Sequence, residues 1–107
     1  MAAIKPATDL QTETSPTTRQ MPLYHVVLID DNEHTYDYVI EMLCGIIRCS
    51  VERAYQLACV VDREGRVIVE TCSLEKAELR REQIHSFGAD WRIERCKGSM
   101  TAEIERA

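Results

Sequence analysis

The chain has 107 residues and a formal net charge of −5 at pH 7. This length predicts one small domain, too small for a deep catalytic cleft surrounded by several loops. Acidic and basic residues are interspersed after residue 30, so no basic face is available for nucleic acid or an anionic membrane. No apolar run approaches the ~18 residues of a membrane span, and the first residues lack the features of signal and transit peptides.

The first 22 residues differ in composition from the rest of the chain. Residues 1–22 are rich in Thr, Pro and Gln and show no apolar periodicity, which predicts a flexible, disordered tail. Residues 23–107 remain to build one folded core. Within that core, residues 23–30 (LYHVVLID) are rich in β-branched and aliphatic side chains and predict a strand.

A helix is predicted after this strand. Residues 31–35 have turn composition, and Asn32 or Thr35 is a candidate cap for the helix. Apolar residues recur at helical spacing from Tyr36 to Ile47, and Gly45 with the following Arg-Cys-Ser break ends the pattern.

A second helix begins after Ser50, a residue type that favours N-caps, and ends at Gly65. Its predicted inner face consists of Ala54, Leu57, Ala58 and Val61. Residues 66–72 (RVIVETC) then predict a short strand, and Ser73 begins a third helix that runs through Phe87 to a stop at Gly88.

The C-terminal part alternates between apolar and polar residues in two stretches, residues 91–96 and 100–104, of which the second predicts a strand more strongly. The resulting order is β-α-α-β-α-β, with room for a short extra strand. We therefore expect an α+β fold, a small α/β sandwich in which three helices pack on one face of a three-stranded antiparallel sheet.

The five cysteines have an odd count and form no CxxC pair. Several lie in apolar-periodic segments, which indicates reduced, partly buried thiols and a cytoplasmic location. Cys72, His85 and Cys96 are conceivable metal ligands, but their spacing matches no common zinc pattern. We therefore predict no metal and no cofactor.

The segment Leu28–Val39 (LIDDNEHTYDYV) carries the most chemical information, because an apolar strand ends there in acidic side chains. In one interpretation, Asp30, Asp31 and Asn32 form a turn and cap the next helix. In another, the acids hold magnesium in a receiver-like regulator. That fold needs a second strand ending in Asp, whereas the run ending in Asp62 completes a helical pattern.

A second segment favours a third interpretation. Residues 51–62 (VERAYQLACVVD), followed by Gly65-Arg66, combine with the acidic junction and with residues 74–78 (LEKAE) in a fixed order and spacing. Together they resemble the Clp protease adaptor family ClpS, from about Leu23 to the C-terminus. The resemblance implies an α/β sandwich with a flexible N-terminal tail.

The resemblance also implies a function without enzymatic activity. Members of this family bind substrates by a destabilising N-terminal residue and deliver them to a AAA+ Clp unfoldase–peptidase. They recognise the free α-amino group with an Asn-Asp-Asp triplet after the first strand and a His at the end of the second helix. These positions are Asp30, Asp31, Asn32 and Asp62 in this chain, so one Asn and one Asp are exchanged and His is replaced by Asp.

By the same resemblance, a pocket for the N-terminal side chain is lined by Leu28, Ile29, His34, Tyr36, Val39, Ala58, Val61 and Met100. Two methionines that are usual in the family, one of which excludes β-branched side chains, correspond to Ala58 and Tyr36. The change removes bulk at one position and adds a ring at the other. We expect altered specificity, with Ile or Val admitted beside Phe, Tyr, Trp and Leu.

The family contacts its unfoldase at the start of the third helix, and the matching residues are Glu75 and Arg80. The tail, residues 1–22, would also engage the unfoldase. The expected partners are thus a Clp-family AAA+ unfoldase and N-degron substrates, and the protein itself is expected to be a monomer.

Two functional alternatives stay open. The first is a docking protein of the same fold that has lost amine binding, because Asp30 and Asp62 depart from the family pattern. The second is the small acidic-site regulator that resembles a receiver domain. An enzyme is disfavoured, because His25, His34 and His85 accompany no nucleophile signature and Cys59 falls at a helix centre.

Overall fold

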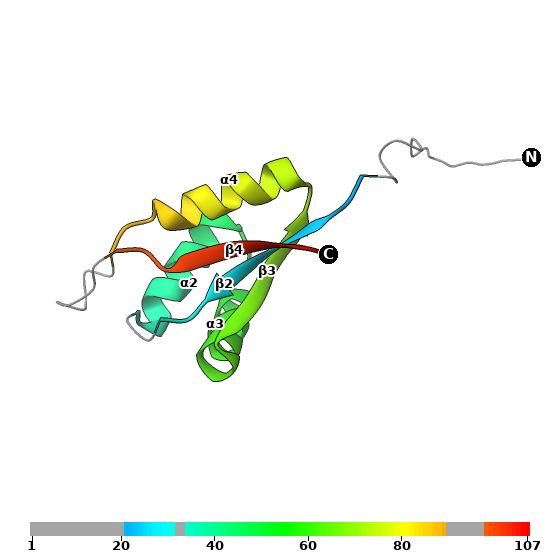
Figure 1. The fold of residues 1–107 in the computed structure, drawn as a ribbon. Coiled ribbons are helices and arrows are strands. Elements are labelled where there is room, and N and C mark those ends of the chain that lie inside the picture. Colours follow the sequence, from blue (N-terminus) through cyan, green and yellow to red (C-terminus); the bar gives the residue numbers. More distant parts are fainter. Residues whose placement is uncertain (1–20, 32–33, 90–97) are drawn as a thin grey trace, which may run out of the picture.

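The computed structural model describes residues 21–31, 34–89 and 98–107. In these ranges the chain forms three helices and three strands (Figure 1). Their order is β2 (Tyr24–Ile29), α2 (Tyr36–Ile46), α3 (Val51–Glu64), β3 (Arg66–Cys72), α4 (Leu74–His85) and β4 (Thr101–Arg106).

The strands form one antiparallel sheet in the order β3-β2-β4, so β2 is central. Its middle residues Val26, Val27 and Leu28 are fully buried, and Val26 and Leu28 belong to the core cluster. The register with β3 shifts between Val26 and Val27. Such a bulge bends a strand locally and increases its twist.

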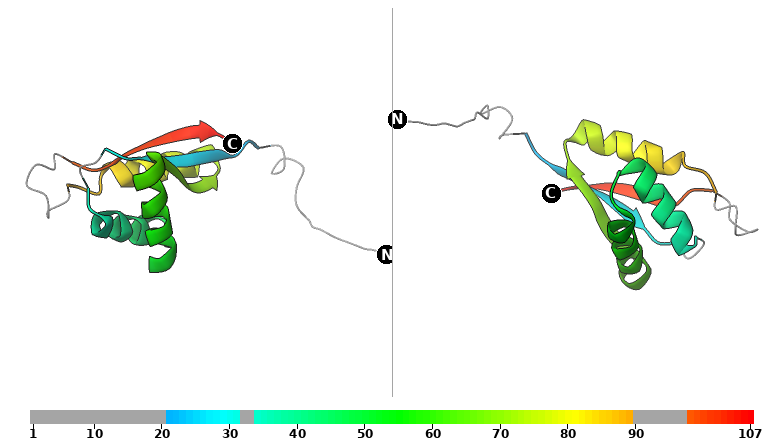
Figure 2. Two further views of the ribbon diagram at one scale, coloured as in Figure 1. Left: turned by 90° about the horizontal axis from the view of Figure 1, so that it is seen from below. Right: turned by 180° about the vertical axis from the view of Figure 1, so that it is seen from behind.

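All three helices lie on one face of the sheet: the strands are in front of α2 and α3 in Figure 1, and these helices are in front in the right-hand view of Figure 2, which is seen from behind. The inward residues of the strands and the apolar faces of the helices form a single core cluster. Its largest fully buried side chains include Tyr38, Leu28, Met42, Leu43 and Ile84. The expected sandwich of three helices on a three-stranded antiparallel sheet is therefore confirmed for the described residues.

The opposite face of the sheet is largely polar. His25 Nδ1 lies 2.8 Å from Thr71 Oγ1, and Arg66 forms an ion pair with Glu105 across the sheet. This amphipathic arrangement explains why the strands alternate in sequence and why one helical layer suffices.

The helix starts follow the predicted capping chemistry. The side chains of Thr35, Ser50 and Ser73 each accept a hydrogen bond from the backbone N–H three residues later. Thr35 is thus a cap of α2, while Asn32 lies outside the described residues.

Two of the predicted helix ends were wrong. Gly45 lies inside α2, and the chain reverses at Arg48, which takes a positive φ of 68°. Helix α4 ends at His85 rather than Phe87, and Gly88 with φ 103° follows. Gly65, with φ 87°, ends α3 in the left-handed conformation that favours glycine.

Some predictions fall on residues that the structure does not describe. These are the tail proposed for residues 1–22, apart from its last two residues, and the strand proposed for 91–96. Within the described ranges, no helix is long and apolar enough to cross a membrane.

Candidate functional site at the β2–α2 junction

The end of β2 is fixed beside the end of α3. The backbone N–H of Asp30 donates to the carbonyl oxygen of Gly65 at 3.0 Å. Gly65 directly follows α3, whose last turn carries Asp62. This bond holds the backbone at the start of the acidic junction beside Gly65, three positions after Asp62, and so beside the partially negative C-terminal end of α3. The carboxylates of the junction attract a positively charged ligand.

His34 organises the other side of the junction. Its Nδ1 lies 2.8 Å from Asp31 Oδ1, and its Nε2 lies 2.8 Å from the carbonyl oxygen of Gly98. The side chain is only 2% exposed and its ring packs on Tyr38 at 4.5 Å. Because a carbonyl only accepts, Nε2 is the donor in the second contact. His34 therefore ties Asp31 to the segment that leads into β4.

Tyr36 and Asp62 form a direct pair across two helices. The Tyr36 hydroxyl, on the first residue of α2, donates to Asp62 Oδ2 at 2.8 Å. This hydrogen bond to a carboxylate raises the pKa of Tyr36 from 10.0 to about 12. The hydroxyl thus stays protonated at physiological pH and fixes one oxygen of Asp62.

The residues predicted to line the side-chain pocket divide into two groups. Ile29 is half-buried and Tyr36 is 39% exposed. The others apart from His34 are buried and belong to the same core cluster, namely Leu28, Val39, Ala58, Val61 and Met100. The fold therefore gathers these residues, from β2, α2, α3 and the segment before β4, in the core.

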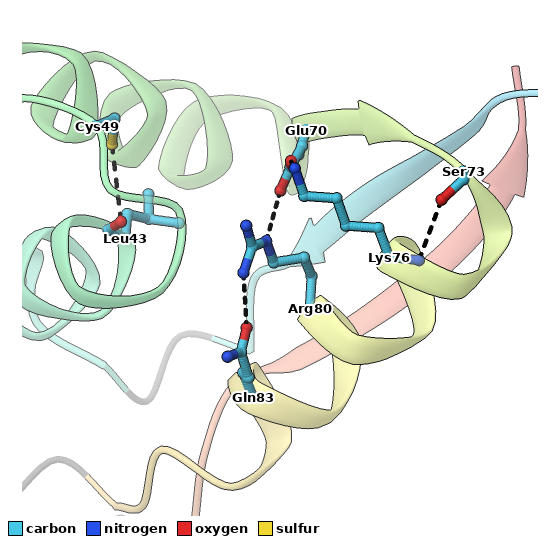
Figure 3. A network of polar contacts seen from close by, with 7 residues as sticks. All are labelled: Leu43, Cys49, Glu70, Ser73, Lys76, Arg80 and Gln83. Atoms are coloured by element: carbon cyan, nitrogen blue, oxygen red, sulfur yellow. Dashed lines mark hydrogen bonds and ion pairs between the residues drawn. The ribbon is translucent and has the colours of Figure 1, made fainter.

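The second proposed surface lies on α4, away from the junction. Glu75 is exposed in the first turn of that helix. Arg80 Nε donates to Glu70 Oε1 at 2.8 Å and Nη1 donates to Gln83 Oε1 at 3.0 Å, as Figure 3 shows. With a side chain only 17% exposed, Arg80 fastens α4 to β3.

Lys76 also reaches Glu70, at 3.4 Å, but its side chain is 51% exposed. The same close-up shows both basic residues converging on Glu70 (Figure 3). Among the basic residues around this carboxylate, Lys76 is thus the more accessible to a partner.

The considered metal set of Cys72, His85 and Cys96 gains no support. The Nε2 of His85 accepts a hydrogen bond from the backbone N–H of Ala102 at 3.0 Å, which occupies that nitrogen. Cys96 lies outside the described residues, and within the described ones no three potential ligand residues cluster.

One neighbour of the site escaped the sequence interpretation. Tyr55 on α3 packs its ring against that of Tyr36, with centroids 5.9 Å apart and an angle of 53°. Tyr55 and Asp62 lie on one face of α3, because seven residues span about two helical turns. This seven-residue spacing is visible in the sequence, but it identifies Tyr55 as a neighbour of the site only once α2 is known to bring Tyr36 against this face of α3.

The chain resembles known proteins over most of its length. The profile of the family described as ATP-dependent Clp protease adaptor protein ClpS matches residues 19–91. The ClpS adapter protein of Vibrio cholerae is 32% identical over 87 residues, which cover 81% of this chain and 82% of that protein.

A longer protein and a solved structure are also similar. The E3 ubiquitin-protein ligase UBR1 of Drosophila melanogaster is 35% identical over 66 residues, and the chain spans 4% of the length of that ligase. The structure of Agrobacterium tumefaciens ClpS2 bound to L-phenylalaninamide superposes with a TM-score of 0.72 at 19% identity, covering 82% of this chain and 100% of that one. The profile match and the Vibrio relative show that the chain belongs to the ClpS family of Clp protease adaptor proteins.

Proposed function

We propose that the protein binds substrates by a destabilising N-terminal residue and delivers them to a AAA+ Clp unfoldase–peptidase. The observation that supports this proposal is the hydrogen bond from the Asp30 backbone to Gly65, because it holds the acidic end of β2 beside the end of α3, the helix that carries Asp62 in its last turn. A charged recognition group beside apolar side chains suits a ligand that carries an ammonium group next to a bulky side chain.

The chemistry of the proposed amine site is favourable. An α-ammonium group has three N–H donors and one positive charge, and carboxylate and amide oxygens accept from it. Asp30, Asp31, Asn32 and Asp62 are the proposed acceptors. The related ClpS2 structure contains L-phenylalaninamide, a small molecule with a free α-amino group and a benzyl side chain. We infer that this chain recognises the same two features.

The replacement of the usual His by Asp62 increases the negative charge of the site, whereas the exchange of Asn and Asp leaves the charge unchanged. With Asp at position 62, the site has a carboxylate where an imidazole is usual, and attraction to a cation increases. Desolvating carboxylates opposes binding, but Asp62 is exposed and already receives the Tyr36 hydroxyl, which limits this cost.

The proposed pocket for the N-terminal side chain differs from the family pattern at two positions. Ala58 is buried and small where the family has a Met that excludes β-branched residues. Tyr36 stands at the other position, but its hydroxyl is directed to Asp62. We therefore expect Ile and Val to be accepted in addition to Phe, Tyr, Trp and Leu.

Fluorescence anisotropy of short labelled peptides tests the function directly. Peptides beginning with Phe, Leu, Trp, Ile or Ala are each titrated with a free and with an acetylated N-terminus. We expect the free bulky-residue peptides to bind and the acetylated ones to fail. If Ile peptides bind no better than Ala peptides, the altered specificity is wrong although the adaptor function stands.

The second candidate is a ClpS-fold docking protein that has lost amine binding. The observation in its favour is that Tyr36 already donates to Asp62. Absence of binding for every free peptide would select this candidate. An unfoldase pull-down with the Glu75→Lys variant would then test docking at the start of α4, where loss of capture is expected if Glu75 contacts the unfoldase.

A further inference from the structure

The start of β4 is held on its outer side by a histidine side chain rather than by another strand. In the described part of the chain, β4 is an edge strand that pairs only with β2. The backbone N–H of Ala102 donates to Nε2 of His85, the last residue of α4, at 3.0 Å. Ala102 is only 3% exposed, and an N–H so buried is costly to leave without an acceptor.

This hydrogen bond fixes which ring nitrogen of His85 carries the proton. An amide N–H can only donate, so Nε2 is the acceptor and the neutral ring has its proton on Nδ1. His34 has the opposite arrangement, because its Nε2 faces the carbonyl oxygen of Gly98 and is the donor. The two histidines are therefore distinguishable by the protonation of Nε2.

The same two histidines hold one short segment at both of its ends. His34 contacts Gly98 and His85 contacts Ala102, and Met100 lies midway between these contacts. Met100 is 1% exposed and belongs to the core cluster that also contains the other buried residues of the proposed side-chain pocket. Met100 and Ala102 face the same side, because alternate residues of an extended chain do so. A shift of the backbone at Ala102 is therefore transmitted to the Met100 side chain.

Side-chain packing alone does not fix this segment. A cavity of about 220 Å³ lies beside the His85 ring, and its other lining residues are Ser99, Met100 and Thr101. The start of β4 thus has free space on the side of α4, and the hydrogen bond to His85 is what limits its movement there.

We propose that His85 is a positioning residue for the pocket that receives the N-terminal side chain of the substrate. Its Nε2 holds the start of β4 and thereby keeps Met100 at the wall of that pocket. This inference rests on the proposed function, and it deepens that function by adding a residue of α4 that itself touches no substrate. The requirement is a hydrogen-bond acceptor at the position of Nε2.

Two substitutions of His85 separate the presence of an amide group from its reach. The amide oxygen of Gln reaches about as far as Nε2 of His, whereas that of Asn reaches only about as far as Nδ1. His85→Gln therefore keeps an acceptor for the Ala102 N–H, and His85→Asn places the same chemical group too far away.

Fluorescence anisotropy with free Phe and Leu peptides measures the consequence in the full chain. We expect His85→Asn to bind about three- to tenfold more weakly than the wild type, the effect of one neutral hydrogen bond, and His85→Gln to stay within about twofold. Affinities are expressed per folded molecule, with the folded fraction of each variant taken from urea unfolding. Glu82→Gln, an exposed change one helical turn earlier, is the matched control and should alter no affinity.

Two further measurements follow the hydrogen bond itself in the absence of peptide. Long-range proton–nitrogen NMR spectra at about pH 8, where histidine is neutral, should show His85 protonated on Nδ1. Hydrogen exchange of the Ala102 amide should be faster in His85→Asn than in the wild type and should stay slow in His85→Gln. A wild-type His85 protonated on Nε2 would contradict the bond and the inference with it.

The outcomes separate this inference from the function on which it rests. Faster exchange at Ala102 in His85→Asn with unchanged peptide affinity would overturn the positioning role and leave the adaptor function intact. Equal weakening in His85→Asn and His85→Gln would also overturn it, because the ring rather than the acceptor would then matter. Failure of every free peptide to bind the wild type would overturn both the function and this inference.

Discussion

Two carboxylates of this protein have opposite surroundings, although both lie where a helix meets another element. Glu70 on β3 receives two cationic side chains, Arg80 and Lys76, from α4. Asp62 on α3 receives the neutral hydroxyl of Tyr36 from α2. In the first case the chain supplies the countercharge itself, and the carboxylate holds two elements together. In the second the negative charge is oriented but not neutralised by that bond, which is the arrangement that the proposed binding of an α-ammonium group requires.

The largest expected effect concerns Asp62. Replacing it in Asp62→Asn keeps the size of the side chain and removes the charge. We expect the affinity for free Phe peptides to fall by about 10- to 100-fold, the magnitude of a charge-assisted hydrogen bond. The unfolding free energy should change by no more than about 0.5 kcal/mol, since the residue is exposed. Peptide titration and urea unfolding measure the two quantities.

The contrast would fail if Asp62→Asn unfolded the protein while peptide affinity per folded molecule stayed unchanged. Asp62 would then resemble Glu70, a structural carboxylate. Glu64→Gln, a neighbouring exposed change in the same helical turn, is the control and should alter neither quantity.

The reverse pattern is expected at Glu70. In Arg80→Ala, the half-buried Glu70 loses its 2.8 Å partner, and the unfolding free energy should fall by about 1–2 kcal/mol. Peptide affinity should be unaffected, because α4 contributes no residue to the proposed amine site. The matched variant Lys76→Ala removes the longer and more exposed contact and should cost less than about 0.5 kcal/mol. Equal losses in the two variants would show that burial does not distinguish these partners.

The secondary structure was largely predictable from the sequence, whereas the different surroundings of the two carboxylates were not. The strands and helices followed from local periodicity, and Ser50 and Ser73 capped their helices as their positions predicted. The end of α2 was harder to predict from the sequence. Gly45 is compatible with a helix, and the change of chain direction after α2 depends on Arg48 adopting a positive φ.

The site depended on contacts between residues distant in sequence. Asp30, Tyr36 and Asp62 were selected from the sequence by resemblance, but Tyr36 and Asp62 are 26 positions apart and their bond requires α2 to pack on α3. The contact of His34 with Gly98 spans 64 positions. Local patterns contain no information on such pairs. The sequence therefore predicted the residues of the site but not the hydrogen bonds between them.

The effect that is smallest at neutral pH is a change in the titration of Tyr36, and it tests directly whether the Tyr36 hydroxyl bonds the Asp62 carboxylate. The hydrogen bond to the carboxylate raises the pKa of Tyr36 from 10.0 to about 12. We expect Asp62→Asn to return this pKa toward 10.0. Ultraviolet absorbance of tyrosinate, taken as the difference from Tyr36→Phe to remove the other tyrosines, measures the shift.

The same pair gives a signed pH dependence. Because the folded state binds the Tyr36 proton more tightly than the unfolded state, this group stabilises the fold below pH 10.0, and the contribution is lost as the pH rises through about 12. The free energy of unfolding is measured against pH for the wild type and for Asp62→Asn. The loss of stability that Tyr36 causes at high pH should be present in the wild type and absent in the variant. An unchanged titration of Tyr36 would mean that the hydroxyl does not bond the carboxylate in solution. The orientation of Asp62, and with it the contrast to Glu70, would then need another origin.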